Sequence, residues 1–309
     1  MASLGRDHFG LQSPRTTSLP GAAGAVADDR AIALISQPTT TVVGGVLLWA
    51  QQAAAVLESV IVDGEAGLVE QWLDGFDPRP AVFGLDGNLP VEPVPPADRR
   101  ARPAPAVPPA FDLADVEVVI EDGVVRAEVD GLEVARLVVH EDGEARLEVG
   151  VGHYDRAGHQ VMSAARPVDE TLGEVVTAVR ASRHRGAPAH TYNRLCRERW
   201  LRSVLVVDPS LVGLVELHPV DPIPVRSGLR DTAPAPAIGS DREGAKVLLM
   251  ASAGVDPGLA PSTSAVARRE GPDRIVVALP PRDLIAPTRR LLNTLRWPVE
   301  TATIEPPWV

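Results

Sequence analysis

The sequence has few of the residues that crosslink chains, bind zinc or fill aromatic cores. Its 309 residues include one cysteine, Cys196, and one lysine, Lys246, and aromatic residues make up 4%. A single cysteine excludes an intramolecular disulfide and a multi-cysteine zinc site, so we expect a reducing, cytoplasmic location. Because aromatics are scarce, Val, Leu, Ile and Ala must build the hydrophobic cores, as in sheets flanked by helices.

The chain also lacks a long uninterrupted apolar run. The longest run, residues 42–56, is interrupted by Gln51 and Gln52 and is too short to span a bilayer comfortably. No basic segment joined to a compact apolar stretch precedes it, so a signal peptide is not expected. We therefore expect a soluble protein without a membrane partner.

Charge is unevenly distributed along the chain. The net charge is −11: residues 1–189 carry 15 basic and 28 acidic side chains, and residues 190–309 carry 15 basic and 13 acidic ones. The acidic first part disfavours a general nucleic-acid coat or an anionic membrane surface as partner. Any nucleic-acid contact must be local, and the candidates are Arg194, Arg197, Arg199 and Arg202.

The first third of the chain predicts a tail, a small module and a linker. Residues 1–28 are rich in Gly, Ser, Pro and Ala without periodicity, and we expect a disordered tail. Residues 29–95 alternate apolar strand and helix patterns and predict a small α/β module. Prolines recur every few residues in the segment 96–110, which is typical of an extended linker.

Residues 111–185 predict an antiparallel β meander closed by a helix over residues 168–182. The turn dipeptides Asp122-Gly123, Asp130-Gly131 and Asp142-Gly143 separate four strand candidates. Asp-Gly pairs favour tight hairpins because both positions tolerate positive φ. We expect one face of this meander to be acidic and solvated.

The last segment, residues 186–309, shows the order helix, strand, strand, helix, strand, helix, strand. Its opening helix carries Glu198 and ends at DPSLVG, and the apolar run AKVLLMASAG follows an acidic-Gly turn and ends at Gly254. RIVVALPPRD and TRRLLNTL complete the order. Over residues 190–306 this order resembles the nuclease domain of the restriction-endonuclease-like superfamily, most nearly the mismatch-specific endonucleases of archaea and high-G+C bacteria. The predicted fold is α/β, or α+β overall, with a mixed C-terminal sheet flanked by helices.

The resemblance implies a metal site that this sequence does not complete. In such nucleases an Asp and a Glu-x-Lys on paired strands hold a divalent metal and activate water, because Mg²⁺ prefers hard oxygen ligands. The corresponding positions are Pro236, Met250 and Ser252. A thioether does not bind Mg²⁺ and a serine carries no charge, so the resemblance implies a degenerate active site without a cofactor.

Acidic residues nearby leave an alternative open. Glu198, Asp231, Asp241 and Asp256 can be combined into a relocated Mg²⁺ site. However, Asp241 falls in an expected surface turn and Asp256 at an expected helix cap. We favour the structural interpretation of these four residues.

Two further candidates come from residues that bind metals or act as nucleophiles. His140, His153 and His159 lie near Asp155 and can supply metal ligands, but no helical ligand motif fixes their geometry, and solvated turn positions are the simpler interpretation. Cys196 lies among arginines that can lower a thiol pKa, but an inert, half-buried thiol is the commoner case.

Three functions remain compatible with these patterns. The first is a non-enzymatic interaction or scaffold protein that reuses a nuclease-like fold to bind a protein partner. The second is a nucleic-acid-processing nuclease of the DNA-repair type with a relocated carboxylate site, for which Mg²⁺ is the cofactor. The third is a small-molecule-binding regulator that uses the N-terminal module.

Overall fold

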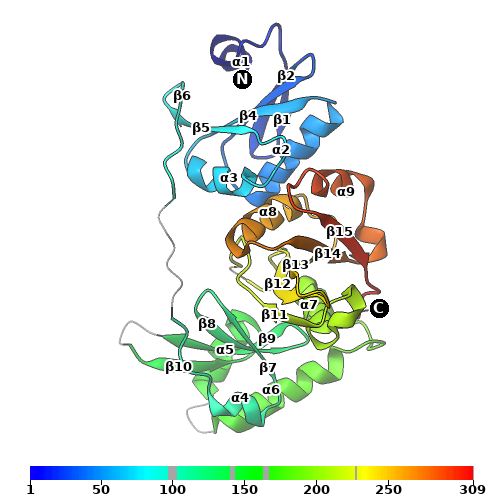
Figure 1. Ribbon diagram of the computed structural model, residues 1–309. Coiled ribbons are helices and arrows are strands. Elements are labelled where there is room, and N and C mark those ends of the chain that lie inside the picture. The colour runs from blue at the N-terminus through cyan, green and yellow to red at the C-terminus, as the bar shows by residue number, and fades with distance from the viewer. Residues whose placement is uncertain (97–102, 140–142, 163–166, 227, 309) are drawn as a thin grey trace. The chain divides into compact units, whose positions relative to one another are not determined.

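The chain has an α/β fold, as the sequence predicts (Figure 1). The computed structural model describes residues 1–96, 103–139, 143–162, 167–226 and 228–308. These ranges contain nine α-helices and three β-sheets. No helix within them is both long and apolar enough to cross a membrane.

Contacts divide the chain into two compact units, each assembled from separate segments. Unit 1 consists of Met1–Arg99, Gly254–Ile275 and Arg282–Thr301. Unit 2 consists of Arg100–Ala253, Val276–Pro281 and Ala302–Val309. This division differs from the predicted one, in which residues 186–309 formed a domain of their own.

Residues 1–28 are folded, so the expected disordered tail is wrong. They form helix α1 (Ala2–Phe9) and strands β1 (Arg15–Leu19) and β2 (Ala22–Ala27). Strand β2 consists of Ala, Gly and Val, and a Cβ at Gly24 would lie only 2.4 Å from the Trp49 ring. Small residues are therefore needed here for close packing, although the same composition is typical of a disordered tail.

The sheet of unit 1 has six strands in the order β1-β2-β3-β4-β5-β6. Its remaining strands are β3 (Arg30–Ile35), β4 (Val56–Val62), β5 (Ala81–Asp86) and β6 (Leu89–Val91). β3, β4 and β5 are mutually parallel, and β1, β2 and β6 pair antiparallel with their neighbours. The predicted helices join the parallel strands as α2 (Thr40–Gln52) and α3 (Ala66–Leu73).

Two helices from the last third of the chain also belong to unit 1. They are α8 (Leu259–Glu270) and α9 (Ala286–Leu292), and α8 packs against both α2 and α3. All residues of α8 from Leu259 to Ala267 are buried, although three of them carry hydroxyls. Thr263 donates to the Leu259 carbonyl at 2.7 Å, and Ser264 accepts from the Gly75 N–H at 3.1 Å. These bonds satisfy two of the three hydroxyls, whereas the buried Ser262 Oγ has no hydrogen-bond partner among the described residues.

Unit 2 contains the predicted meander. Its strands are β7 (Glu117–Glu121), β8 (Val124–Val129), β9 (Leu132–Val139) and β10 (Ala145–Val149), in the antiparallel order β10-β9-β8-β7. The turn pairs Asp122-Gly123 and Asp130-Gly131 all have positive φ, as predicted. Asp142 of the third pair lies outside the described residues.

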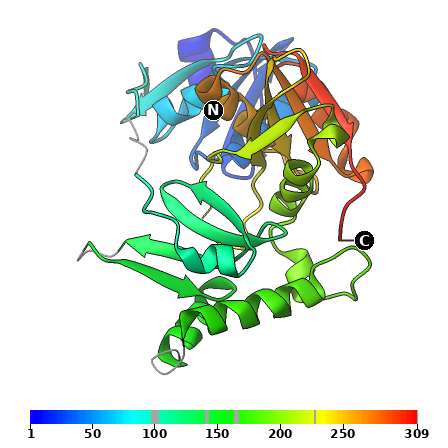
Figure 2. The same cartoon turned by 60° about the horizontal axis from the view of Figure 1, so that its bottom comes forward.

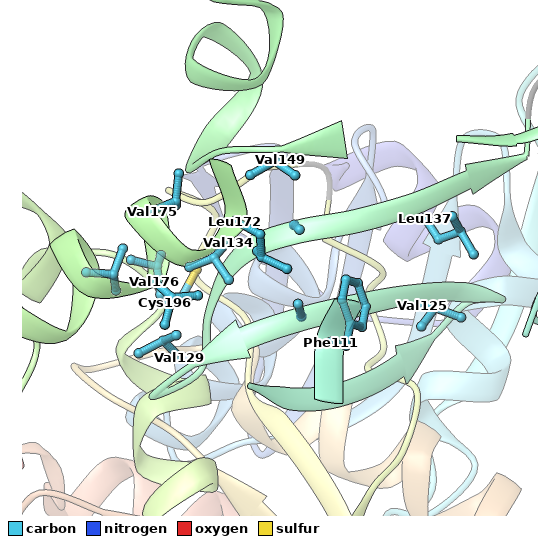
Figure 3. Packing of buried hydrophobic residues seen from close by; sticks show 14 residues of the cluster. Phe111, Val125, Val129, Val134, Leu137, Val149, Leu172, Val175, Val176 and Cys196 are labelled. Atoms are coloured by element: carbon cyan, nitrogen blue, oxygen red, sulfur yellow. The ribbon is translucent and has the colours of Figure 1, made fainter. Parts of the chain in front are cut away.

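One face of this meander forms one of the hydrophobic cores of unit 2 (Figure 3). Helix α6 (Val168–Ser182) lies where predicted and buries Leu172, Val176 and Val179 against the sheet. Figure 2 shows the ribbons of the meander and of this helix from another side. Helix α4 (Pro109–Leu113) adds Phe111. The sequence pattern predicts the fourth strand over residues 144–155, but β10 ends at Val149 and helix α5 (Gly152–Met162) follows it.

The C-terminal sheet has the order β11-β12-β13-β14-β15. Its strands are β11 (Glu216–Pro219), β12 (Ala235–Ser240), β13 (Lys246–Ala251), β14 (Arg274–Leu279) and β15 (Val299–Thr303), and helix α7 (Arg197–Val207) precedes them. The predicted order of elements is present, with β11 in addition. Strand β13 is central, and every residue after Lys246 is buried, which confirms the expected buried strand.

Candidate functional site

The three positions that the nuclease resemblance assigns to metal binding carry non-acidic residues in the sheet. Pro236 on β12 lies directly opposite Met250 on β13. Met250 is completely buried, and Ser252, also buried, donates its N–H to the Ala278 carbonyl at 2.9 Å. Aliphatic side chains of the same strands, including Leu249, form the adjoining core. These three positions therefore offer no carboxylate to a cation.

The remaining acidic candidates bind backbone N–H groups. Asp241 accepts from the N–H groups of Glu243 at 3.1 Å and Ala245 at 2.9 Å, which confirms its predicted turn. Asp256 accepts from Gly258, the N-cap of α8, at 2.8 Å. Asp231 accepts from the Gly228 N–H at 2.8 Å. Nowhere in the described ranges do three His, Cys, Asp or Glu side chains come together as a metal site.

Glu198, the fourth candidate, belongs to a buried ion pair. It lies on α7 and accepts from Arg226 at 2.9 Å. Each side chain of this pair is 6% exposed. The carboxylate is thus neutralised within unit 2 by a residue that the sequence patterns did not single out.

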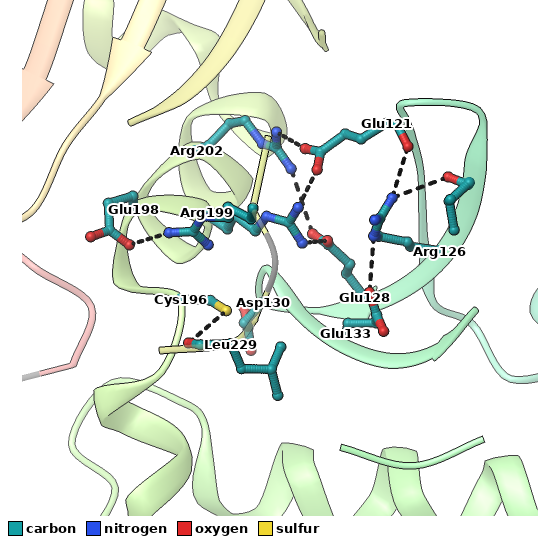
Figure 4. Close-up of polar contacts among 12 residues, drawn as sticks. Glu121, Arg126, Glu128, Asp130, Glu133, Cys196, Glu198, Arg199, Arg202 and Leu229 are labelled. Carbon is teal, nitrogen blue, oxygen red and sulfur yellow. Dashed lines mark hydrogen bonds and ion pairs between the residues drawn. The ribbon is translucent and has the colours of Figure 1, made fainter. Parts of the chain in front are cut away.

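Two of the four arginines proposed to contact nucleic acid are buried. Arg199 donates to Glu128 at 2.7 Å and also pairs with Glu121, and Arg202 donates to Glu121 at 2.6 Å (Figure 4). Both guanidinium groups are consumed by these carboxylates, so Arg199 and Arg202 cannot contact a phosphate at the surface. The expectation fails because helix periodicity does not reveal which element covers a polar helix face.

The expected solvated, acidic face of the meander is wrong where these ion pairs lie. Glu121, Glu128 and Glu133 are all buried. Burial by itself raises the pKa of Glu121, but Arg202 and Arg199 outweigh it and hold that pKa below the ordinary value. Helix α7 therefore covers part of this face with two arginines that match Glu121 and Glu128 in number, whereas Glu133 pairs with Arg126 and Arg156.

The other two arginines are closer to the surface. Arg194 is exposed, whereas Arg197 is half-buried. The Nε of Arg197 donates to the Asn193 carbonyl at 3.1 Å, and its guanidinium lies 5.3 Å from the centre of the Trp308 ring. Two separate arginines make a much weaker phosphate-binding surface than the predicted four.

A cavity of about 510 Å³ lies in unit 2, and we call it the arginine pocket. The residues that line it come from β8, β9, the start of α5, the start of α7 and the loop before β12. Six arginines line it, against the two carboxylates of Glu133 and Asp231; these arginines are Arg126, Arg136, Arg156, Arg199, Arg226 and Arg230. Most of the carboxylates that pair with them lie outside the lining. The lining therefore holds more cationic than anionic side chains, although every one of these arginines except Arg230 also has a carboxylate partner within the described residues.

A ladder of ion pairs forms the sheet side of this pocket. Arg126 and Arg136 lie directly opposite each other on β8 and β9, which is unfavourable unless anions intervene. Glu133 accepts from Arg126 at 2.9 Å and from Arg156 at 2.8 Å. Glu148 accepts from Arg136 at 2.9 Å, and the Arg156 Nε is 3.5 Å from it. The ladder joins three strands to α5 and leaves one positive charge in excess.

The histidine candidates for metal binding and the Cys196 thiol lie in different surroundings. His153 lines the arginine pocket, whereas His140 and the side chain of His159 lie outside the described residues. Cys196 is buried, and its thiol lies 3.5 Å from the Leu229 carbonyl. Burial raises the pKa of Cys196, with arginines opposing the shift, so its local environment does not activate it as a nucleophile.

Comparison with known proteins gives no family: no family model, no curated protein and no solved structure matches the chain. The function must therefore be inferred from the site itself. The sequence contained one signal of the arginine pocket, which is the alternation of Arg and Glu along residues 126–148. Alternation alone also fits a solvated strand face, and the sequence pattern therefore predicts an acidic, solvated face of the meander.

Proposed function

We propose that this protein acts by binding and not by catalysis, as a cytoplasmic interaction or scaffold protein whose last third follows a nuclease-like element order. The observation that carries the proposal is the pairing of Pro236 with Met250 inside the C-terminal sheet. A metal-dependent nuclease needs carboxylates at these positions, because Mg²⁺ requires hard oxygen ligands. No cofactor is part of the proposal.

A protein partner is favoured over nucleic acid. Arg199 and Arg202 are consumed by internal ion pairs, and the chain carries a net charge of −11. Large aliphatic side chains at the end of α7 are instead exposed: Val207 by 79%, Leu211 by 50% and Val215 by 55%. Exposed aliphatic side chains close together in the sequence are typical of a protein contact surface.

The alternative, a nuclease with a relocated site, requires several carboxylates to converge on one ion. Asp241 and Asp256 each bind backbone N–H groups, and Glu198 is neutralised by Arg226. Within the part of the chain that the structure describes, these carboxylates do not come together in a group of three that could hold an ion. The nuclease alternative therefore remains the less favoured function.

A cleavage assay separates the two functions. Purified protein is incubated with labelled single-stranded, duplex and mismatched DNA in Mg²⁺ and in Mn²⁺, beside an Asp231→Asn variant and an Asp256→Asn variant. We expect no cleavage by any of the three proteins. Cleavage by the wild type that either variant abolishes would contradict the proposal and establish the nuclease alternative.

The binding part of the proposal needs its own measurement. Wild-type protein and a Leu211→Asp variant are used side by side as bait for cell extract, with a Leu89→Asp variant in unit 1 as control, because Leu89 is similarly exposed. We expect a partner that the wild type and the Leu89 variant retain and the Leu211 variant loses. Equal recovery by all three baits would contradict a contact surface at the end of α7.

A further inference from the structure

Arg226, one of the residues that line the arginine pocket, carries a buried hydrogen-bond donor with no acceptor among the described residues. Arg226 lines the pocket with a side chain that is 6% exposed. Its Nη2 donates to Glu198 at 2.9 Å and to the Ala233 carbonyl at 3.2 Å, whereas its buried Nη1 has no hydrogen-bond partner. A buried polar group without a partner costs about 1–3 kcal/mol, so a ligand acceptor toward which this guanidinium turns would be favoured.

The start of helix α5 forms another wall of the same pocket. Gly152, His153 and Tyr154 line the pocket at the first turn of this 11-residue helix. The first N–H groups of a helix have no intrahelical acceptor and carry partial positive charge. Asp155 takes up one neighbouring donor, the Val151 N–H, at 2.8 Å. The helix start thus adds donors to a pocket that arginines already line.

The pocket is also partly apolar. Val151, Leu195 and Leu229 line it and pack against the core of unit 2. Its volume of about 510 Å³ lies within the usual range for small-molecule sites, which combine apolar walls with a few convergent polar groups. A purely inorganic ion would leave these apolar walls without contact.

We propose that the arginine pocket binds a small organic carboxylate, with the anionic group between Arg226, Arg230 and the start of α5 and an apolar portion against Leu195 and Leu229. Arg230 is exposed, so its side chain has room to move towards a ligand. A planar carboxylate matches a guanidinium group in geometry. A phosphate group needs more hydrogen-bond donors than a carboxylate does. The guanidinium groups of Arg126 and Arg136 already donate to Glu133 and Glu148.

The inference goes beyond the proposed function, since it assigns a ligand site that neither the cleavage assay nor the partner assay addresses. Fluorine NMR of fluorobenzoate with the full chain tests it, because benzoate combines one carboxylate with an apolar ring. Fluorobenzamide has the same shape without the charge, and inorganic phosphate serves as competitor. Two pocket variants, Arg226→Lys and Arg230→Gln, are compared with Arg242→Gln, an exposed arginine of unit 2 outside the pocket.

We expect saturable fluorobenzoate binding that unlabelled benzoate reverses, with fluorobenzamide weaker by about tenfold or more. Arg226→Lys keeps a cation beside Glu198 but loses the planar Nη1, and Arg230→Gln removes an exposed charge. Each should weaken binding about threefold to tenfold, while Arg242→Gln leaves it unchanged. Thermal melting of each variant separates loss of binding from loss of folding.

Several results would overturn the inference. Binding of fluorobenzamide as tight as that of fluorobenzoate would show that the pocket does not recognise the negative charge. Displacement of fluorobenzoate by equimolar phosphate would show that the pocket is not selective for a carboxylate. Unchanged affinity in both folded pocket variants would place the ligand elsewhere. Absence of saturable binding up to about 10 mM would also contradict the proposal, because that concentration reveals even weak sites.

Discussion

Arg202 on α7 donates a hydrogen bond of 2.6 Å to Glu121 on β7, and the two side chains are only 2% and 3% exposed. This bond and those of Arg199 join the opening helix of the C-terminal segment to the meander inside unit 2. The stability of unit 2 therefore depends on charges that the sequence alone places at the surface.

Arg202→Met should strongly destabilise unit 2. The substitution leaves two buried carboxylates with one guanidinium, and the loss of one partner from a buried pair costs about 3–5 kcal/mol. The double variant Arg202→Met, Glu121→Met restores the charge balance and should be much less destabilised than Arg202→Met alone. Urea unfolding followed by tryptophan fluorescence measures both. A double variant that is the less stable of the two would contradict the charge argument.

The turn glycine Gly131 provides a steric test of the same contact. It has φ of +70°, and a Cβ there would lie 2.3 Å from the carbonyl carbon of Arg199. Gly131→Ala should therefore cost more than the roughly 1–2 kcal/mol of the left-handed conformation alone. Gly244→Ala is the matched control, because Gly244 has φ of +81° with no atom within 4 Å of its Cβ. Equal loss of thermal stability in the two variants would show that this close approach does not exist.

The pH dependence of stability should reveal Glu117. Burial raises its pKa above the ordinary 4.5, although Ser203 donates a hydrogen bond to it at 2.6 Å. The folded state then holds this proton more tightly than the unfolded state, so the contribution is present below pH 4.5 and is lost as pH rises through the folded pKa. Relative to wild type, Glu117→Gln should become progressively more stable as pH rises above 4.5.

The contribution of Glu58 in unit 1 to stability should depend on pH in the opposite direction. A hydrogen bond from Arg30 at 2.8 Å lowers the pKa of Glu58, so its contribution is present above pH 4.5 and is lost as pH falls through the folded pKa. Glu58→Gln should lose stability relative to wild type as pH rises towards 4.5. Urea unfolding across pH 3 to 7 measures both variants. The same sign in both would contradict the assignment of Glu117.

Cys196 should react with iodoacetamide only when unit 2 opens. Its thiol is buried and its pKa is raised, so both access and thiolate formation are suppressed in the folded state. Because it is the single cysteine, mass spectrometry follows one site without interference. Labelling should accelerate steeply across the urea transition, and rapid labelling in native buffer would contradict the buried position.

Short-range patterns were sufficient for much of the fold. The Asp-Gly pairs predicted the hairpins at Asp122 and Asp130, because two consecutive positive φ angles are a local property. Helix α6 was predicted close to its bounds, and the order of elements after Arg197 was predicted except for β11. The absence of carboxylates at Pro236 and Met250 is likewise a property of the sequence.

The sequence by itself determined the α/β elements, the hairpin turns and the non-acidic residues on β12 and β13. Only the tertiary structure decided that α8 and α9 join unit 1, that Arg199 and Arg202 are buried, and that arginines distant in the sequence line one pocket. The physical reason is that periodicity records which face of an element is apolar, whereas the burial of a polar face depends on charges supplied by another element. Glu121 and Glu128 are buried here because α7 brings Arg199 and Arg202 to them.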